Sequence, residues 1–170
     1  KFSTLIERMD QLMLSAVDGL KPGVSYVDLH AETYLEIGKV LKEFGFINVD
    51  AETAAEAGVI STFFPHGLGH HLGLQVHDVG GFMADERGTH IDPPSKHAFL
   101  RTSRMVEANQ VFTIEPGLYF IDSLLEELKN SKYASMVNWQ AVEEMRPYGG
   151  IRIEDNIIVH QSHNENMTRS

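Results

Sequence analysis

Apolar residues in the first part of the chain recur at helical spacing. Thr4 and Glu7 have the spacing of a capping box, and Gly19 lies just before Lys21-Pro22-Gly23. This pattern predicts an amphipathic helix that ends near Gly19. Its apolar stripe consists of positions 5, 6, 9, 12, 13, 16, 17 and 20.

A second stripe predicts a second long helix, which Ser25 and Asp28 open and Gly45 ends. Its apolar face runs through Val27, Ala31, Tyr34, Leu35, Val40, Leu41 and Phe44. We expect both helices to pack on one side of a sheet as scaffold. As the alternative to a pure scaffold role, Tyr26 and His30 reach a cleft from near the turn between the helices.

Shorter elements are expected after these helices. Asp50 is a candidate cap for a short Ala-rich helix that runs to Gly58. Residues 82–103 are turn-rich and polar, and a loop of that length inside a compact domain is more often functional than idle. The loop contains His90 and His97, for which the sequence predicts no role.

The second half of the chain predicts strands interrupted by short helices. Residues 111–114 form a short apolar run typical of a buried strand, and Glu115 follows it at once. Asp122 begins a short helix through Leu128, and Asn138 caps another that ends near Met145. Residues 151–159 predict a last strand, and the tail from residue 161 is polar and uninformative. One face of that strand holds Ile151, Ile153, Ile157 and Val159, and the other holds Arg152, Glu154 and Asn156.

The most unusual stretch is Phe64–Gly81, where four of the nine histidines fall within twelve residues among glycines. His66 and His70 have helical spacing, but the interleaved glycines each cost a helix about 1 kcal/mol relative to alanine. We therefore expect a loop that leads into a strand, in which these two imidazoles point to the same side. A lone histidine is usually a packed core residue; four with this glycine pattern favour a site, provided that carboxylates complete it.

Composition narrows the class of protein. The 170 residues suit one domain, and 42% hydrophobic with 22% charged residues is typical of a globular chain. The net charge of −10 argues against nucleic acid or an anionic membrane as partner. The chain has no cysteine, so a disulfide or a thiolate metal site is excluded. Without an apolar run of roughly 20 residues or a signal-peptide pattern, the cytoplasm is the expected location.

The residues that the pattern singles out suggest a metal site. Glu115 ends a buried strand, where an unpaired carboxylate would be costly. Together with Glu154 and the histidines it could line a metal cleft. One imidazole with two carboxylates suits manganese, cobalt, zinc or ferrous iron better than copper. The residues alone therefore indicate metal-assisted hydrolysis.

Residues 66–78 resemble, over their whole length, the signature His-Gly-Leu-Gly-His-x-Leu-Gly-Leu-x-Val-His-Asp of proline-specific metallopeptidases with the "pita-bread" fold. Residues 113–117 and 150–155 resemble the two glutamate motifs of the same family, in the expected order. The insertion between them resembles bacterial Xaa-Pro dipeptidases (prolidases) and the related organophosphorus acid anhydrolases. The resemblance implies an α+β fold in which helices back a curved, mostly antiparallel sheet.

The resemblance also implies a role for each matching residue. His70, Glu115 and Glu154 would bind metal, with Glu154 bridging two ions and Glu115 also serving as general base. His66 would stabilise the tetrahedral intermediate, and His77 would hold the substrate near its proline. Arg152 would meet the substrate carboxylate or support the site. Val76, Tyr26 and Leu100 are candidates to line the pocket, and His71, at a variable position, is expected to be structural.

One feature of the family is not found in these residues. The resemblance implies five ligands for two divalent metal ions, with manganese expected and cobalt or zinc as alternatives. Two of the ligands would be aspartates on a strand before the first helix, whereas the aspartates in residues 1–60 fall on predicted helices or their caps. We therefore expect residues 1–170 to be the C-terminal portion of one catalytic domain, without the N-terminal domain and the first catalytic strands.

The expected activity of the parent protein is hydrolysis of the peptide bond before proline in Xaa-Pro dipeptides, with organophosphate triester hydrolysis as a side activity. The isolated chain is expected to be weakly active or inactive. Two alternatives remain, an Xaa-Pro aminopeptidase and a non-catalytic pita-bread binding module. The resemblance further implies a homodimeric parent, and neither nucleic acid nor membrane is expected as partner.

Overall fold

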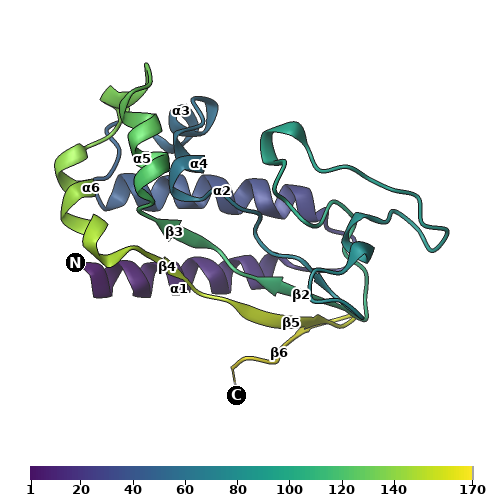
Figure 1. Cartoon of the computed structure of the whole chain (residues 1–170). Helices are drawn as coiled ribbons and strands as arrows, with labels where there is room; N and C mark the ends of the chain where they lie inside the picture. Colours follow the sequence, from purple (N-terminus) through teal and green to yellow (C-terminus); the bar gives the residue numbers. More distant parts are fainter. Residues whose placement is uncertain (170) are drawn as a thin grey trace. The chain divides into compact units, whose positions relative to one another are not determined.

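The computed structural model describes residues 1–169 and divides the chain into two compact units. Unit 1 comprises residues 1–12, 34–65 and 117–152, and unit 2 comprises residues 13–33, 66–116 and the described residues from 153 onward. The two long helices, α1 (Phe2–Gly19) and α2 (Tyr26–Glu43), each contribute residues to both units. Figure 1 labels these elements along the chain.

The helices confirm the apolar pattern. The α1 helix begins at Phe2, so the predicted start with a cap at Thr4 is wrong because Thr4 lies inside the first turn, and the helix ends at Gly19 as predicted. At the start of α2, the Ser25 hydroxyl accepts a hydrogen bond of 3.2 Å from the amide of Asp28, as its capping role requires. Asp50 likewise caps α3 (Ala51–Glu56) by accepting from the amide of Thr53 at 2.7 Å.

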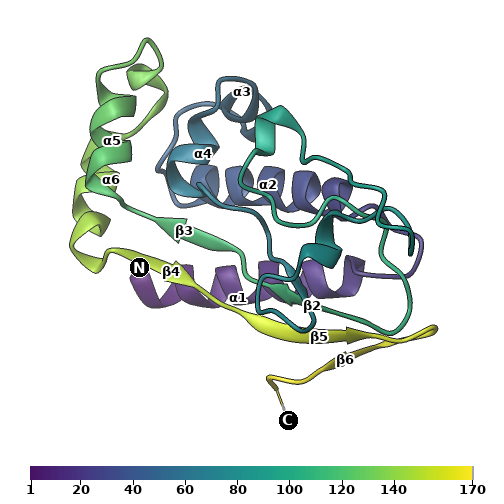
Figure 2. The ribbon, with the colours of Figure 1, turned by 45° about the vertical axis from the view of Figure 1, so that its right-hand side comes forward.

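Unit 2 contains a four-stranded antiparallel sheet in the order β1-β2-β5-β6. Figures 1 and 2 show β2 and β5 side by side in both views. The central pair places Phe112 opposite Ile157. The strands are β1 (His71–Leu72), β2 (Gln110–Ile114), β5 (Asp155–Val159) and β6 (Asn164–Asn166).

The core of unit 2 lies between one face of this sheet and parts of both long helices. It contains Phe112, Ile114, Ile157 and Val159 from β2 and β5, together with Met13, Ala16, Val17 and Leu20 of α1 and Tyr26 and Leu29 of α2. These helix and strand residues form one buried apolar cluster, so the prediction that the long helices pack on one side of a sheet is confirmed. The side chains of Thr113 and Asn156 belong to the other face because successive strand residues alternate.

Unit 1 holds a two-stranded antiparallel sheet and short helices. Phe46 and Phe63 pack edge-on against Phe120, with ring centroids 5.4 and 6.2 Å apart. The elements are β3 (Gly117–Tyr119), β4 (Gly150–Arg152), α3, α4 (Val59–Phe63), α5 (Asp122–Lys129) and α6 (Trp139–Met145). The expected helices that begin at Asp122 and after Asn138 are therefore confirmed.

Besides these helices and strands, the described residues form four short 3₁₀ turns. They are η1 (Val79–Phe82), η2 (Ser95–His97), η3 (Ala134–Met136) and η4 (Arg146–Tyr148). Two of them lie in or at the start of the 82–103 segment, which otherwise lacks regular structure as predicted. No helix among residues 1–169 is both long and apolar enough to span a lipid bilayer.

Two expectations about strands are wrong, and three further elements were not predicted. The predicted strand 151–159 is two strands, β4 and β5, because the chain leaves the ladder at Ile153 and Glu154. The segment from His66 forms only the two-residue strand β1 rather than a longer extended run. The α4 helix and the strands β3 and β6 have no counterpart in the predictions. In β6 side-chain contacts add to the backbone pairing with β5, since Asn164 Nδ2 donates to the carbonyls of Val17 and Leu20 at 2.8 and 2.7 Å.

Candidate metal centre

His70 is fixed against the central strand of the unit 2 sheet. Its carbonyl accepts from the amide of Thr113 at 3.0 Å, and its own amide donates to the Thr113 hydroxyl at 2.9 Å. These two bonds continue the pairing of β1 with β2 by one residue. The side chain of His70 is 6% exposed, so its position is determined by packing as well as by the backbone.

Glu115 and Glu154 face each other because of the strand register. Ile114 pairs with Asp155 at the end of the β2–β5 ladder, so the next residue of each strand stands opposite the other. Glu115 is 7% exposed, whereas Glu154 is exposed. The break that divides the predicted last strand therefore occurs at the position of the second candidate carboxylate.

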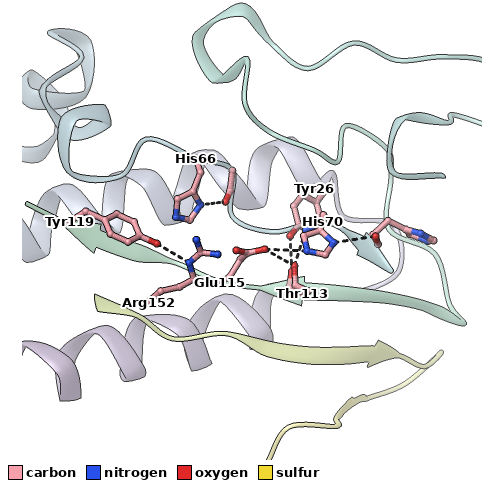
Figure 3. A network of polar contacts seen from close by, with 9 residues as sticks. Tyr26, His66, His70, Thr113, Glu115, Tyr119 and Arg152 are labelled. Carbon is pink, nitrogen blue, oxygen red and sulfur yellow. Dashed lines mark hydrogen bonds and ion pairs between the residues drawn. The ribbon is translucent and has the colours of Figure 1, made fainter. Parts of the chain in front are cut away.

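The three predicted metal ligands converge in unit 2. One ligand atom from each of His70, Glu115 and Glu154 lies within 4.8 Å of the other two. Among residues 1–169, no other group of three or more His, Asp or Glu side chains brings its possible ligand atoms together in this way. Figure 3 shows His70 and Glu115 pointing toward each other, with His70 Nε2 3.4 Å from Glu115 Oε1.

The hydrogen bonds around His70 fit a metal ligand. Its Nδ1 lies 3.3 Å from the carbonyl oxygen of His71, which can only accept, so Nδ1 is the donor in this contact and Nε2 is the ring nitrogen on the side of Glu115. Metal-binding histidines are commonly oriented in this way by a carbonyl at the second nitrogen. With two carboxylates, the donor set suits a hard or borderline divalent ion such as manganese, cobalt or zinc.

Thr113 connects two of the three candidate ligands, His70 and Glu115, a role that was not predicted from the sequence. Its hydroxyl donates to Glu115 Oε1 at 2.9 Å while it accepts from the amide of His70. The Tyr26 hydroxyl donates to the Thr113 carbonyl at 3.0 Å. Burial, and then the charge of Glu115, raise the pKa of Tyr26 well above its usual value, so it stays a donor. The sequence contained one indication of this contact. Side chains alternate between the two faces of a strand, so residues 113 and 115 are expected on the same face of β2.

We expect Thr113→Val to weaken manganese binding by about 10- to 100-fold, because Glu115 loses a donor and the His70 amide loses its acceptor. Thr113→Ser is the matched control, since it keeps the hydroxyl and should bind within a few-fold of the native chain. Calorimetric titration with manganese measures both variants. Equal affinities for the valine and serine variants would show that the hydroxyl does not orient the ligands.

The structure places two further candidate residues in unit 2. The His77 ring is edge-on to the His70 ring, with centroids 4.3 Å apart, although His77 is exposed. Desolvation, followed by His70 and Arg101, lowers the pKa of His77. His66 Nδ1 lies 2.7 Å from the carbonyl oxygen of Gly67. Their catalytic roles remain predictions.

Arg152 belongs to β4 in unit 1. Its Nε donates to the Tyr119 hydroxyl at 2.8 Å, as Figure 3 shows. A Cβ added at Gly150 would lie 2.8 Å from the Tyr119 ring, and one at Gly117 would overlap it, so the ring fits closely between two glycines. Tyr119 therefore orients the guanidinium, and the role of Arg152 toward a substrate stays a prediction.

The remaining candidates are placed as follows. Tyr26 and Leu100 are fully buried in the core of unit 2, while Val76 is 70% exposed. His71, expected to be structural, packs edge-on against Phe112 with centroids 5.1 Å apart. His30 is 1% exposed, and its Nδ1 accepts from the amide of Leu68 at 3.2 Å. Because it bonds to Leu68, His30 lies beside the histidine segment and does more than pack within the helical scaffold.

His30 should make the stability of the chain depend on pH. Burial, then the charges of His97 and His66, lower the pKa of His30 to about 3. Below its ordinary pKa of 6.5 the unfolded chain binds a proton here that the folded chain does not bind until about pH 3, so stability is lost as pH falls through this window. The loss is about 1.4 kcal/mol per unit, or about 2 kcal/mol between pH 7 and 5.

Urea unfolding at several pH values measures this loss. His30→Asn is the matched variant, since its amide oxygen can accept from Leu68 but does not titrate. The native chain should lose about 2 kcal/mol more than the variant between pH 7 and 5. Parallel pH profiles for the two chains would contradict the assignment.

The chain is similar to known proteins over almost its whole length. The sequence model of metallopeptidase family M24 matches residues 1–161. An Xaa-Pro dipeptidase of Colwellia psychrerythraea is 78% identical over 169 residues, which are 99% of this chain and 38% of that protein. An Xaa-Pro dipeptidase of Shewanella loihica is 58% identical over 168 residues, with the same two coverages. The chain therefore spans about two fifths of the length of these relatives.

Solved structures show the same fold. Aminopeptidase P from E. coli in its low-pH form superposes with a TM-score of 0.66 at 25% identity, over 96% of this chain and 30% of that chain. Proline aminopeptidase P II from Yersinia pestis superposes with a TM-score of 0.63 at 29% identity, over 99% of this chain and 32% of that chain. These likenesses confirm the predicted fold of helices with an antiparallel sheet.

Proposed function

This chain belongs to metallopeptidase family M24, and from that premise we propose that it forms the C-terminal part of the catalytic domain of a metal-dependent Xaa-Pro dipeptidase. The convergence of His70, Glu115 and Glu154 carries the proposal. A family member that had become a non-catalytic binding module would no longer need these metal ligands. Their presence therefore favours an enzyme. The two relatives named as Xaa-Pro dipeptidases support the substrate class.

In the proposed site, His70 Nε2 and the carboxylates of Glu115 and Glu154 would hold the metal. A divalent metal ion in this position lowers the pKa of water and polarises a carbonyl group. Glu115 would accept the proton of the attacking water, because its carboxylate is buried and held by Thr113. We expect manganese, with cobalt or zinc as alternatives, and a second ion held partly by two aspartates outside these residues.

The other candidate side chains would bind and orient the dipeptide. His66 would hold the oxygen of the tetrahedral intermediate, and His77 would lie near the proline of the substrate. Arg152, oriented by Tyr119, would meet the free carboxylate, for which a guanidinium is well suited. We further propose a cytoplasmic, homodimeric parent protein, and a phosphotriesterase side activity, since a tetrahedral phosphorus centre resembles the tetrahedral carbon intermediate in shape.

The test uses a chimera in which residues 1–169 replace the matching segment of the C. psychrerythraea dipeptidase. At 78% identity, this exchange should preserve the packing of that protein. With manganese, the chimera should hydrolyse an Xaa-Pro dipeptide, whereas the 170-residue chain alone should show weak or no activity. Intact-enzyme activity in the chain alone would refute the proposed dependence on outside ligands.

Two further substrates distinguish the dipeptidase from the alternative functions. A tripeptide with proline in second position tests for an aminopeptidase, and a phosphotriester tests for the side activity. Preference for the tripeptide would assign the chain to an aminopeptidase instead. Absence of hydrolysis in a folded chimera loaded with manganese would favour the binding module.

A further inference from the structure

One peptide group joins His30 to His66. The amide of Leu68 donates to His30 Nδ1 at 3.2 Å, and the carbonyl of Gly67 lies 2.7 Å from His66 Nδ1. The Gly67 carbonyl and the Leu68 amide belong to the same peptide plane. The two histidines are therefore linked through two hydrogen bonds and one rigid, polar group.

We propose that His30 is a positioning residue that fixes the orientation and the tautomer of His66 through the Gly67–Leu68 peptide group. The catalytic consequence rests on the proposed function, in which His66 contacts the reacting carbonyl. The effect on the His66 tautomer does not depend on that function. Neither the apolar pattern of the helix that contains His30 nor the signature around His66 predicts this positioning role.

The hydrogen-bond partners define the tautomer of each ring. A carbonyl oxygen only accepts, so His66 Nδ1 must carry the proton in its bond to Gly67. An amide only donates, so His30 Nδ1 must keep its lone pair in its bond to Leu68. Both bonds polarise the same peptide group in the same direction, which strengthens each of them. In the neutral His66 ring the lone pair then lies on Nε2, and only the protonated ring, in which both nitrogens donate, could hold the oxygen of the tetrahedral intermediate.

The peptide group has little freedom to turn away from His30. The carbonyl of Leu68 accepts from the amide of Glu115 at 2.7 Å, which ties the next peptide to the candidate metal ligand. A Cβ added at Gly67 would lie 2.8 Å from Leu100 Cα, so the backbone here is closely packed. The His97 ring is edge-on to His30, with centroids 4.4 Å apart, and supports it from the 82–103 loop.

The bond can be measured directly in the native chain. We expect a scalar coupling across the hydrogen bond between the Leu68 amide nitrogen and His30 Nδ1 by nuclear magnetic resonance. The imidazole ¹⁵N shifts should show His66 protonated at Nδ1 when its ring is neutral. A His66 ring protonated mainly at Nε2 would overturn the proposal without any variant.

Variants then test the dependence on His30. His30→Asn keeps an acceptor near the Nδ1 position and should leave the His66 tautomer unchanged. His30→Ala removes the acceptor, and His66 should shift toward a mixture of tautomers. His90→Ala, an exposed histidine of the loop, is the control for loss of an imidazole. If the alanine variant does not fold, His30→Gln replaces it, since its longer side chain moves the acceptor away from the amide of Leu68.

An unchanged His66 tautomer in the folded alanine or glutamine variant would overturn the proposal. In the chimera, the alanine variant should lower kcat by about 10- to 100-fold with little change in KM, because a misplaced catalytic group mainly affects the chemical step. The asparagine variant should restore most of this activity. Should the chimera be inactive, the tautomer measurement still decides the positioning role, so the two failures remain distinguishable.

Discussion

Replacing Glu115 with glutamine is expected to lower kcat of the chimera for an Xaa-Pro dipeptide by at least about 10³-fold. The substitution removes a metal ligand and the proposed general base together. The folded structure should tolerate it, because the glutamine carbonyl can still accept from the Thr113 hydroxyl. Without metal, this variant chain should unfold at the same or a higher urea concentration than the native chain, since a buried charge next to Glu154 is removed.

Glu127→Gln is the matched control, because Glu127 is exposed on α5. It should leave both kcat and the urea midpoint close to the native values. A Glu115→Gln chimera with kcat within a few-fold of native would exclude the carboxylate as base. A large drop in stability would instead indicate that Glu115 serves mainly to hold the fold.

Replacing Gly69 with alanine is expected to lower the free energy of unfolding of the chain by about 3 kcal/mol. A Cβ at this position would lie 2.7 Å from the Tyr26 hydroxyl and would overlap the carbonyl oxygen of Thr113. Gly69 lies next to His70, so relief of the clash must move the candidate ligand. Manganese affinity should therefore fall by about 10- to 100-fold as well.

Gly88→Ala separates the clash from the backbone effect. Gly88 has a φ of 81°, and no neighbouring atom lies within 4 Å of the position that a Cβ would take, so alanine there meets only conformational strain. That strain should cost about 1 kcal/mol and leave manganese affinity unchanged. Equal unfolding free energies for the two variants would contradict the close approach at Gly69.

The hydrophobic pattern predicted the helices well, since their caps and stripes are local. Ser25 and Asp50 cap the helices that the sequence assigned to them. The strands were harder to predict because their stability comes from distant partners. The β6 strand is polar and, besides its backbone pairing with β5, is held by the side chains of Asn164 and Asn166, the latter donating to Asp155 at 2.7 Å. No apolar alternation marks such a strand.

The candidate ligands could be predicted from the sequence, but the groups that orient them could not. Thr113 lies in an apolar run, where a threonine is unremarkable until the His70 amide is placed opposite it. His30 lies 38 positions before Leu68 in the sequence, and only the folded chain brings it to the amide of that residue. Gly67 and Gly69 are sites of close approach between backbone segments. Their φ values are not positive, so packing rather than a turn requires them.

His70, Glu115 and Glu154 are proposed to form a metal centre. Calorimetric titration of the metal-free chimera with manganese, beside a variant carrying His70→Ala, Glu115→Gln and Glu154→Gln, tests it most directly. We predict that the chimera binds two ions and that the triple variant, still folded, binds none. Binding of manganese by the triple variant with undiminished stoichiometry and affinity would contradict the assignment of all three ligands.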